Sequence, residues 1–191
     1  AMRSIVVHSA VASQRGDEIA PIDPFRLSEQ ERTSPTRFEV SFVIDGTEHQ
    51  YGFEASRTRV HEEWLYDYPT NRRRRWFERR YDADTGEDNY KFYDAMKGEK
   101  QQIATSTRPN ALYLSTAAQL NNDAVAPVFD WFRNQLEHVR GSAVQSDRTA
   151  RLCEEEEMRT AVVTLLKAAD VGIRDLTIEE EEMEMSSPAS D

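Results

Sequence analysis

The chain has 191 residues, of which 38% are hydrophobic and 31% charged, and its formal net charge is −11. This length suits one domain with appendages, and the negative charge argues against binding nucleic acid or a membrane over the whole surface. No apolar run has the length of a membrane span, and a single cysteine, Cys153, excludes an internal disulfide. We therefore expect a soluble, cytoplasmic protein with no membrane partner.

The first 36 residues predict a helix and an extended connection. Residues 2–13 carry apolar side chains at helical spacing, and nothing before them resembles a helix cap. We therefore expect that the beginning of this helix is missing from the sequence. Residues 14–36 contain three prolines and few apolar residues, which is typical of an extended segment.

From Arg37 the apolar residues recur every second position, which is typical of strands. Asp45-Gly46 is a two-residue turn signal between two such segments, and Thr85-Gly86 marks the tip of a second hairpin. Residues 37–93 therefore predict an antiparallel meander of about five strands. The predicted strands are residues 37–44, 49–55, 60–68, 75–81 and 89–93.

Helical spacing returns in the second half of the chain, so we predict a helical subdomain over residues 94–172. Its predicted parts are a short apolar strand at 110–115, a helix from Asn122 or Asp123 to about Val139, and a helix at 147–169 that buries Met158 and Leu165 and ends at Gly172. Residues 173–191 predict a short strand, at 173–178, and an acidic, disordered tail. The fold class that we predict is α+β.

The residues that could bind a metal or act as a nucleophile do not form a recognised pattern. Cys153 lies beside the acidic run Glu154–Glu157, which would blunt its reactivity, so we expect a buried or half-buried helix residue rather than a nucleophile. The histidines lack the spacing that would place two ligands on one metal, and we predict no metal site. They are His8, His49, His61 and His138.

One basic cluster could bind a polyanion, because arginines pair with phosphates and the neighbouring aromatic rings can stack on bases. On a strand, alternation would send Arg73, Arg75 and Arg79 to one face and divide the cluster. We therefore favour a charged hairpin edge and keep a nucleic-acid interface as the alternative. The cluster consists of Arg72, Arg73, Arg75, Arg79 and Arg80.

The sequence resembles a known family through a set of short motifs. These are Arg37–Phe42, Asp45-Gly46, Tyr51–Phe53, Glu63–Tyr66, Trp76–Arg79 and Arg108–Ser115. As a set they resemble the middle section of bacterial AAA-family ATP-binding proteins of the ABC/SMC-like type, the group that includes abortive-infection and other phage-defence ATPases. The resemblance covers about residues 2–178 and implies part of an ABC-type ATPase head.

The motifs that hold nucleotide phosphates in that family are missing here. The chain has seven glycines but no glycine-rich loop followed by Lys and Ser or Thr, and no signature or Walker B motif follows. The resemblance therefore implies a truncated or excised section whose intact form uses ATP and magnesium. We expect this chain alone to be inactive, with no cofactor of its own.

The resemblance implies one surviving site residue. In ABC-type ATPases a glutamine at the end of a core strand reaches the magnesium and the attacking water. Gln119 occupies the corresponding place, and Asn121 is the second choice. The implied partner is the remainder of an ATPase head or an effector protein. A regulatory subunit that docks a separate protein through the helices at residues 123–169 remains a further alternative.

Overall fold

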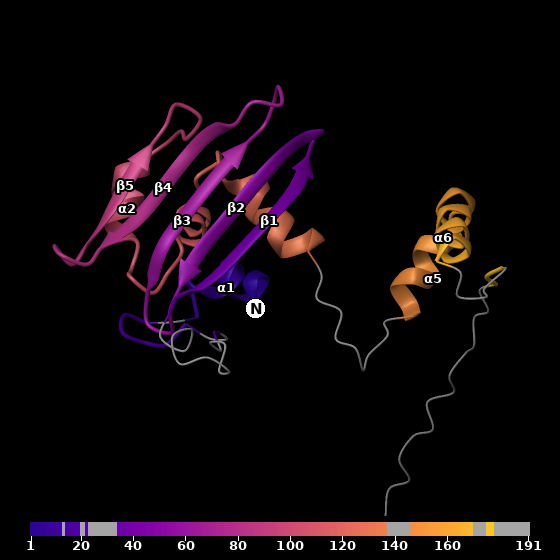
Figure 1. The fold of residues 1–191 in the computed structure, drawn as a ribbon, viewed down its shortest axis with the longest axis horizontal. Helices are drawn as coiled ribbons and strands as arrows, with labels where there is room; N and C mark the ends of the chain where they lie inside the picture. Colours follow the sequence, from indigo (N-terminus) through magenta and orange to yellow (C-terminus); the bar gives the residue numbers. More distant parts are fainter. Residues whose placement is uncertain (13, 20–21, 23–33, 137–145, 170–174, 178–191) are drawn as a thin grey trace, which may run out of the picture. The chain divides into compact units, whose positions relative to one another are not determined.

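The computed structural model describes residues 1–12, 14–19, 22, 34–136, 146–169 and 175–177 (Figure 1). The chain forms two compact units, Ala1–Glu137 and His138–Asp191. Among the helices of these described ranges, none is long and apolar enough to cross a membrane. The first unit contains α1 (Met2–His8), β1 (Thr36–Ile44), β2 (Thr47–Ala55), β3 (Val60–Asp67), β4 (Arg74–Asp82), β5 (Glu87–Phe92), α2 (Lys100–Ser106), α3 (Tyr113–Gln119), α4 (Ala126–Asp130) and the π-helix η1 (Trp131–Gln135); the second contains α5 (Ser146–Glu154) and α6 (Glu156–Ala168).

The five strands form one antiparallel sheet in the order β1-β2-β3-β4-β5, which confirms the predicted meander and the α+β class. Asp45 and Gly46 have φ angles of 49° and 75°, as the tight turn between β1 and β2 requires. The helices of the first unit lie on one face of this sheet, behind it in Figure 1. The sheet therefore has an inner face that packs on helices and an outer face that they leave uncovered.

The predicted alternation along the first hairpin is confirmed. His49, Tyr51, Phe53 and Ala55 of β2 all lie buried on the inner face. Tyr51, Phe53 and Ala55 belong to an apolar core that β1, β3 and β4 extend and that the helices of the first unit complete. Its helical side consists of Ile5, Val6, Ile103, Leu112, Tyr113, Leu114, Ala117, Val125, Val128, Phe129 and Phe132.

The strand predicted at residues 110–115 is wrong, because this run enters helix α3 at Tyr113. Residues Ala111 to Ala117 are all buried. A short run that is apolar on every side fits a buried helix as well as a buried strand, so its period could not distinguish the two.

The helix predicted from residue 123 is shorter and divided into α4 and η1. Asn122 does not cap it: the Asn122 Oδ1 atom accepts the N–H of Ala124, and Val125 at the N-cap position has no side-chain cap bond. Pro127 lies in the first turn, where its missing N–H is tolerated. The part of the prediction beyond Leu136, up to Val139, lies outside the described residues.

The predicted helix at 147–169 appears as α5 and α6, but its predicted burial is wrong. No residue of α6 is buried, and Met158 and Leu165 are 40% and 71% exposed. Cys153 in α5 is buried, as expected. Gly172 and the acidic tail lie outside the described residues; of the strand predicted at 173–178, residues 175–177 are described and are not a strand.

Gly52 is required on the outer face because Trp64 lies directly across it. A Cβ atom at position 52 would lie 2.3 Å from Trp64 Cζ2 and 2.8 Å from the carbonyl oxygen of Phe38. We predict that Gly52→Ala lowers the free energy of unfolding by about 1–3 kcal/mol, because ring and backbone must both shift. Chemical denaturation measures this change.

Two variants control this prediction. Ser41→Ala, on the exposed outer face of β1, should change stability by less than about 0.5 kcal/mol. Gly52→Ala should cost less in a Trp64→Leu background than in the unchanged protein, since the ring clash is removed while the Phe38 carbonyl remains. A cost for Gly52→Ala no larger than that for Ser41→Ala would contradict the close packing.

Candidate functional site

A buried carboxylate from the sheet holds the first turn of α3. Glu63 of β3 is 1% exposed, and it accepts the N–H groups of Tyr113 and Leu114 at 2.7 and 2.9 Å. The Tyr51 hydroxyl donates to the same carboxylate at 2.9 Å. Since Leu112 at the N-cap has no side-chain cap bond, Glu63 satisfies helix donors that would otherwise be unpaired.

Arg79 of β4 holds the loop that leads into α3. Its side chain is fully buried; Nη1 donates to the Ala111 carbonyl at 2.7 Å, and Nη2 to Asp88 at 2.8 Å. Arg79 Nη1 lies 3.8 Å from the Glu63 carboxylate. Burial raises the pKa of the Glu63 carboxyl, and the Arg79 guanidinium and the two backbone amides oppose that rise. The pair thus fixes α3 against the sheet.

Helix α1 is tied to the same segment. Ser9 Oγ accepts the N–H of Leu112 at 3.1 Å and donates to Ser115 Oγ at 3.0 Å, while Ser115 donates to the Val6 carbonyl. Arg108 Nη2 donates to the carbonyl groups of Ser9 and Ala10, the end of α1, at 3.1 Å each. Residues 108–115 therefore join α1, the sheet and α3.

The other end of α3 is open and carries both residues that the resemblance implied. Gln119 is the last residue of α3 and is exposed, so it stands at the end of a helix and not of a strand. Asn121 follows with a φ of 56° and is also exposed. Both amides are free to meet a ligand or another protein surface.

A hollow of about 450 Å³ lies beside Asn121. Asn122 joins its two walls, because its Nδ2 donates to the Lys97 carbonyl at 3.0 Å. A Cβ atom at Gly98 would lie 2.6 Å from that Nδ2, so the 97–99 loop and the 120–124 turn contact closely. The hollow is lined by Lys97, Gly98, Glu99, Gln102, Ile103, Leu120, Asn121, Asn122, Asp123 and Ala124.

The predicted arginine cluster is divided by a bulge that the sequence did not reveal. Leu65 pairs with Phe77 but Tyr66 pairs with Arg75, so Trp76 is an extra residue in β4. Arg75 therefore lies on the outer face, 3.7 Å from Glu78, while Arg79 points into the core. The expectation that Arg75 and Arg79 share a face is therefore wrong. The cluster is still divided, because Arg75 lies on the outer face and Arg79 lies in the core.

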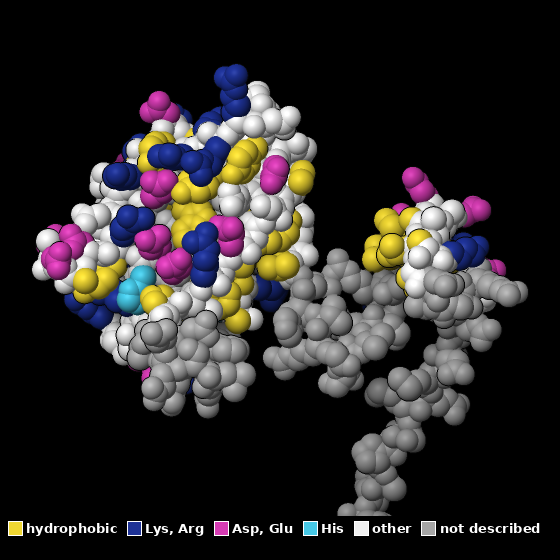
Figure 2. Space-filling view, in the orientation of Figure 1, with side chains coloured by type: hydrophobic (Ala, Val, Ile, Leu, Met, Phe, Trp, Pro, Cys, Tyr) yellow, Lys and Arg dark blue, Asp and Glu magenta, His cyan; other side chains and the backbone are white. Residues whose placement is uncertain are grey.

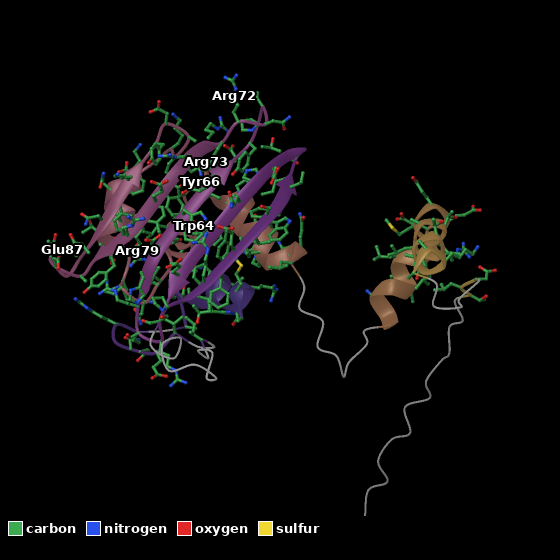
Figure 3. All side chains as sticks on the ribbon, in the orientation of Figure 1. Trp64, Tyr66, Arg72, Arg73, Arg79 and Glu87 are labelled. Atoms are coloured by element: carbon green, nitrogen blue, oxygen red, sulfur yellow. The ribbon has the colours of Figure 1, made fainter. Side chains whose placement is uncertain are left out.

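The remaining arginines of the cluster lie outside the core. Arg80 forms an ion pair with Glu62 at 3.0 Å, and Arg73 lies over the Tyr66 ring at 5.1 Å. Within the described ranges, Arg72 and Arg73 have no carboxylate partner, and both lie near the β3–β4 turn (Figure 3). Figure 2 shows basic and acidic side chains interspersed around hydrophobic ones on this outer face.

The histidines are dispersed. His8 lies in α1, His49 in β2 and His61 in β3, while His138 lies outside the described residues. In the described part of the chain, no group of three or more His, Cys, Asp or Glu side chains could hold a metal ion.

Sequence reasoning missed the pair Glu63 and Arg79 as a unit. The alternation of side chains along each strand places Glu63 on the same face as Leu65, and Arg79 on the same face as Phe77. Alternation does not distinguish a buried ion pair from exposed charges. That distinction requires knowing that α3 covers the two side chains.

The two faces of β3 and β4 allow a matched test of the buried pair. We predict that Glu63→Gln or Arg79→Met lowers the free energy of unfolding by about 3–5 kcal/mol, since each leaves an uncompensated buried charge. The double variant should cost less than the sum of the two. Chemical denaturation of the four proteins measures the coupling.

The adjacent pair, Glu62 and Arg80, is the control. It joins the same strands on the outer face, where Arg80 is 75% exposed. Glu62→Gln and Arg80→Met should each cost less than about 1 kcal/mol. Equal losses from the two pairs would contradict the role of Glu63 and Arg79.

Comparison with known families places most of the chain in one family model. A family model described as "AAA domain, putative AbiEii toxin, Type IV TA system" matches residues 5–181. No curated protein and no solved structure matched the chain.

Proposed function

Because the chain belongs to the AAA domain family described as putative AbiEii toxin, Type IV TA system, we propose that it is a section of an ATPase head that binds and hydrolyses ATP. The observation that carries this proposal is the family match over residues 5–181. We also propose an abortive-infection role in phage defence. We further propose a cytoplasmic location, because a single cysteine suits a reducing compartment.

The residues of this chain do not by themselves fit magnesium or a triphosphate. The sequence has no glycine-rich loop with Lys and Ser or Thr, and the described residues contain no group of three or more His, Cys, Asp or Glu side chains that could hold a metal ion. Gln119 and Asn121 are two exposed amides at one end of α3. We therefore propose that the phosphate contacts come from residues that this sequence does not contain.

In this proposal, the rigid attachment of α3 gives Gln119 a fixed position. Glu63 and Arg79 hold the start of α3, and α3 carries Gln119 at its other end. The exposed Gln119 amide would then orient a water or a magnesium ligand once the remainder of the head is present. Asn121 is the second choice for this role.

The first test uses the 191-residue chain with MgATP. We expect no phosphate release above the buffer rate and no tight binding by calorimetry, because the groups that stabilise a transferring phosphoryl group are missing. Hydrolysis by the purified chain that is lost in Gln119→Ala would overturn the proposal. In-frame coding DNA upstream of Met2 should encode the glycine-rich loop.

A second measurement tests Gln119 in the longer ATPase, in which this chain follows the glycine-rich loop encoded upstream. Gln119→Ala should lower kcat by tenfold or more, on the order expected for a misplaced reacting group. Gln101→Ala is the matched control, because Gln101 is an exposed glutamine in α2. Equal activities of the two variants would exclude the role of Gln119.

A nucleic-acid interface is a second candidate function, favoured by one observation. Arg72 and Arg73 are exposed and lack carboxylate partners in the described ranges, and Arg73 lies over the Tyr66 ring. Two phosphate contacts predict a slope of log affinity against log salt of about −1.8. Electrophoretic mobility shifts with duplex DNA at several salt concentrations measure this slope.

Charge reversal separates these arginines from their neighbours. Arg72→Glu with Arg73→Glu should abolish the binding and its salt dependence, whereas Arg80→Glu, whose arginine is paired with Glu62, should have a smaller effect. Absent or salt-insensitive binding by the unchanged protein removes this candidate.

The second unit is our candidate for contact with an effector. Leu152 of α5 and Met158 and Leu165 of α6 are 44%, 40% and 71% exposed. Exposed large apolar side chains on paired helices are typical of surfaces that bind another protein.

A further inference from the structure

Strand β1 forms one edge of the sheet. Among the described strands it pairs with β2 alone, and that register is unbroken from Thr36 opposite Ala55 to Ile44 opposite Thr47. An edge strand of nine residues with an unbroken register offers a row of backbone donors and acceptors to another strand.

The geometry of the hairpin shows which backbone groups face outward. Ile44 and Thr47 close the two-residue turn, so they form a hydrogen-bonded pair, and even-numbered residues of β1 bond to β2. The Tyr68 N–H bonds to the Glu48 carbonyl at 2.9 Å, which agrees with even-numbered residues of β2 facing β3. The outward groups of β1 therefore belong to Arg37, Glu39, Ser41 and Val43.

This edge carries two exposed charges, Arg37 and Glu39, but lacks several other devices that usually prevent strand addition. Between Thr36 and Ile44 there is no proline and no bulge, and the inward side chains are uncharged. Phe38 and Val40 are only partly buried, and Val43 is 60% exposed. By contrast, the opposite edge, β5, is six residues long and carries charges at Glu87, Asp88 and Lys91.

We propose that the β1 edge binds β1 of a second copy of this chain, in antiparallel orientation, with the two-fold axis at Val40. In this register Val40 faces its own copy, and Phe38 faces Phe42 of the second copy on the inner side. On the outer side Arg37 faces Val43, and Glu39 faces Ser41. No like charges lie opposite each other, and all four outward residues find hydrogen-bonding partners.

The helical layer reaches β1 near one end of the strand. Trp131 of η1 stacks on Phe42 with ring centroids 4.2 Å apart, towards the hairpin end of β1. Because the axis lies at Val40, the two π-helices fall at opposite ends of the joined strands. Both inner faces lie on the same side, so the two sheets continue as one.

Sedimentation velocity over a range of concentrations tests the proposal, and we expect a reversible dimer. Ser41→Pro removes an outward N–H without breaking a bond to β2, so the fold should survive and dimerisation should weaken on the order of tenfold or more. Ser41→Ala is the matched control and should dimerise normally. Circular dichroism checks that each variant folds.

A disulfide test fixes the register. In a Cys153→Ala background, Val40→Cys should give a covalent dimer on mild oxidation, because residues at the two-fold axis come within disulfide distance. Val43→Cys, on the same edge and more exposed, should not. Cross-linking of both variants alike would overturn the register.

Two results would overturn the second copy as the occupant. One is a monomer at every concentration. The other is a dimer that Ser41→Pro leaves unchanged. If the chain is monomeric and Ser41→Pro instead abolishes binding of a different protein, the edge accepts a foreign strand and the proposal of self-pairing is wrong.

Discussion

The buried contact of Glu63 and Arg79 with the segment before α3 is the constraint on which the first unit depends. Both side chains are removed from water, and this costs free energy unless every charge finds partners. The two α3 amides and the Tyr51 hydroxyl donate to the Glu63 carboxylate, and the Ala111 carbonyl and Asp88 accept from Arg79. Of the Arg79 guanidinium nitrogens, only Nε lacks a hydrogen-bond partner among the described residues. These polar contacts add direction to the apolar packing between the sheet and α3, and together they hold the two in one arrangement.

This arrangement makes the two ends of α3 unlike each other. Its start is fixed by the sheet and by Ser9 of α1, whereas its end carries an exposed Gln119 and a turn beside the hollow next to Asn121. A helix anchored at one end holds residues at the other in fixed positions. That is the property an ATPase head would need from a residue that must meet groups on another part of the protein.

The outer face of the sheet has a different character. Gly52 lets Trp64 lie flat against the strands, and Arg37 lies over the Trp64 ring at 4.5 Å. Ion pairs such as Arg80 with Glu62 neutralise most of the basic side chains there. The arginine-rich segment is therefore chiefly a source of ion pairs and ring contacts, with its unpaired charges confined to the β3–β4 turn.

The sequence by itself determined the meander, because period-two alternation and the Asp45-Gly46 turn depend on neighbours along the chain. Its motifs also determined the family. Only the tertiary structure decided that residues 113–119 are a helix, that Trp76 is an extra residue in β4, and that Arg79 is buried with Glu63. Each of these depends on which surface covers a residue, and that surface comes from segments distant in the sequence.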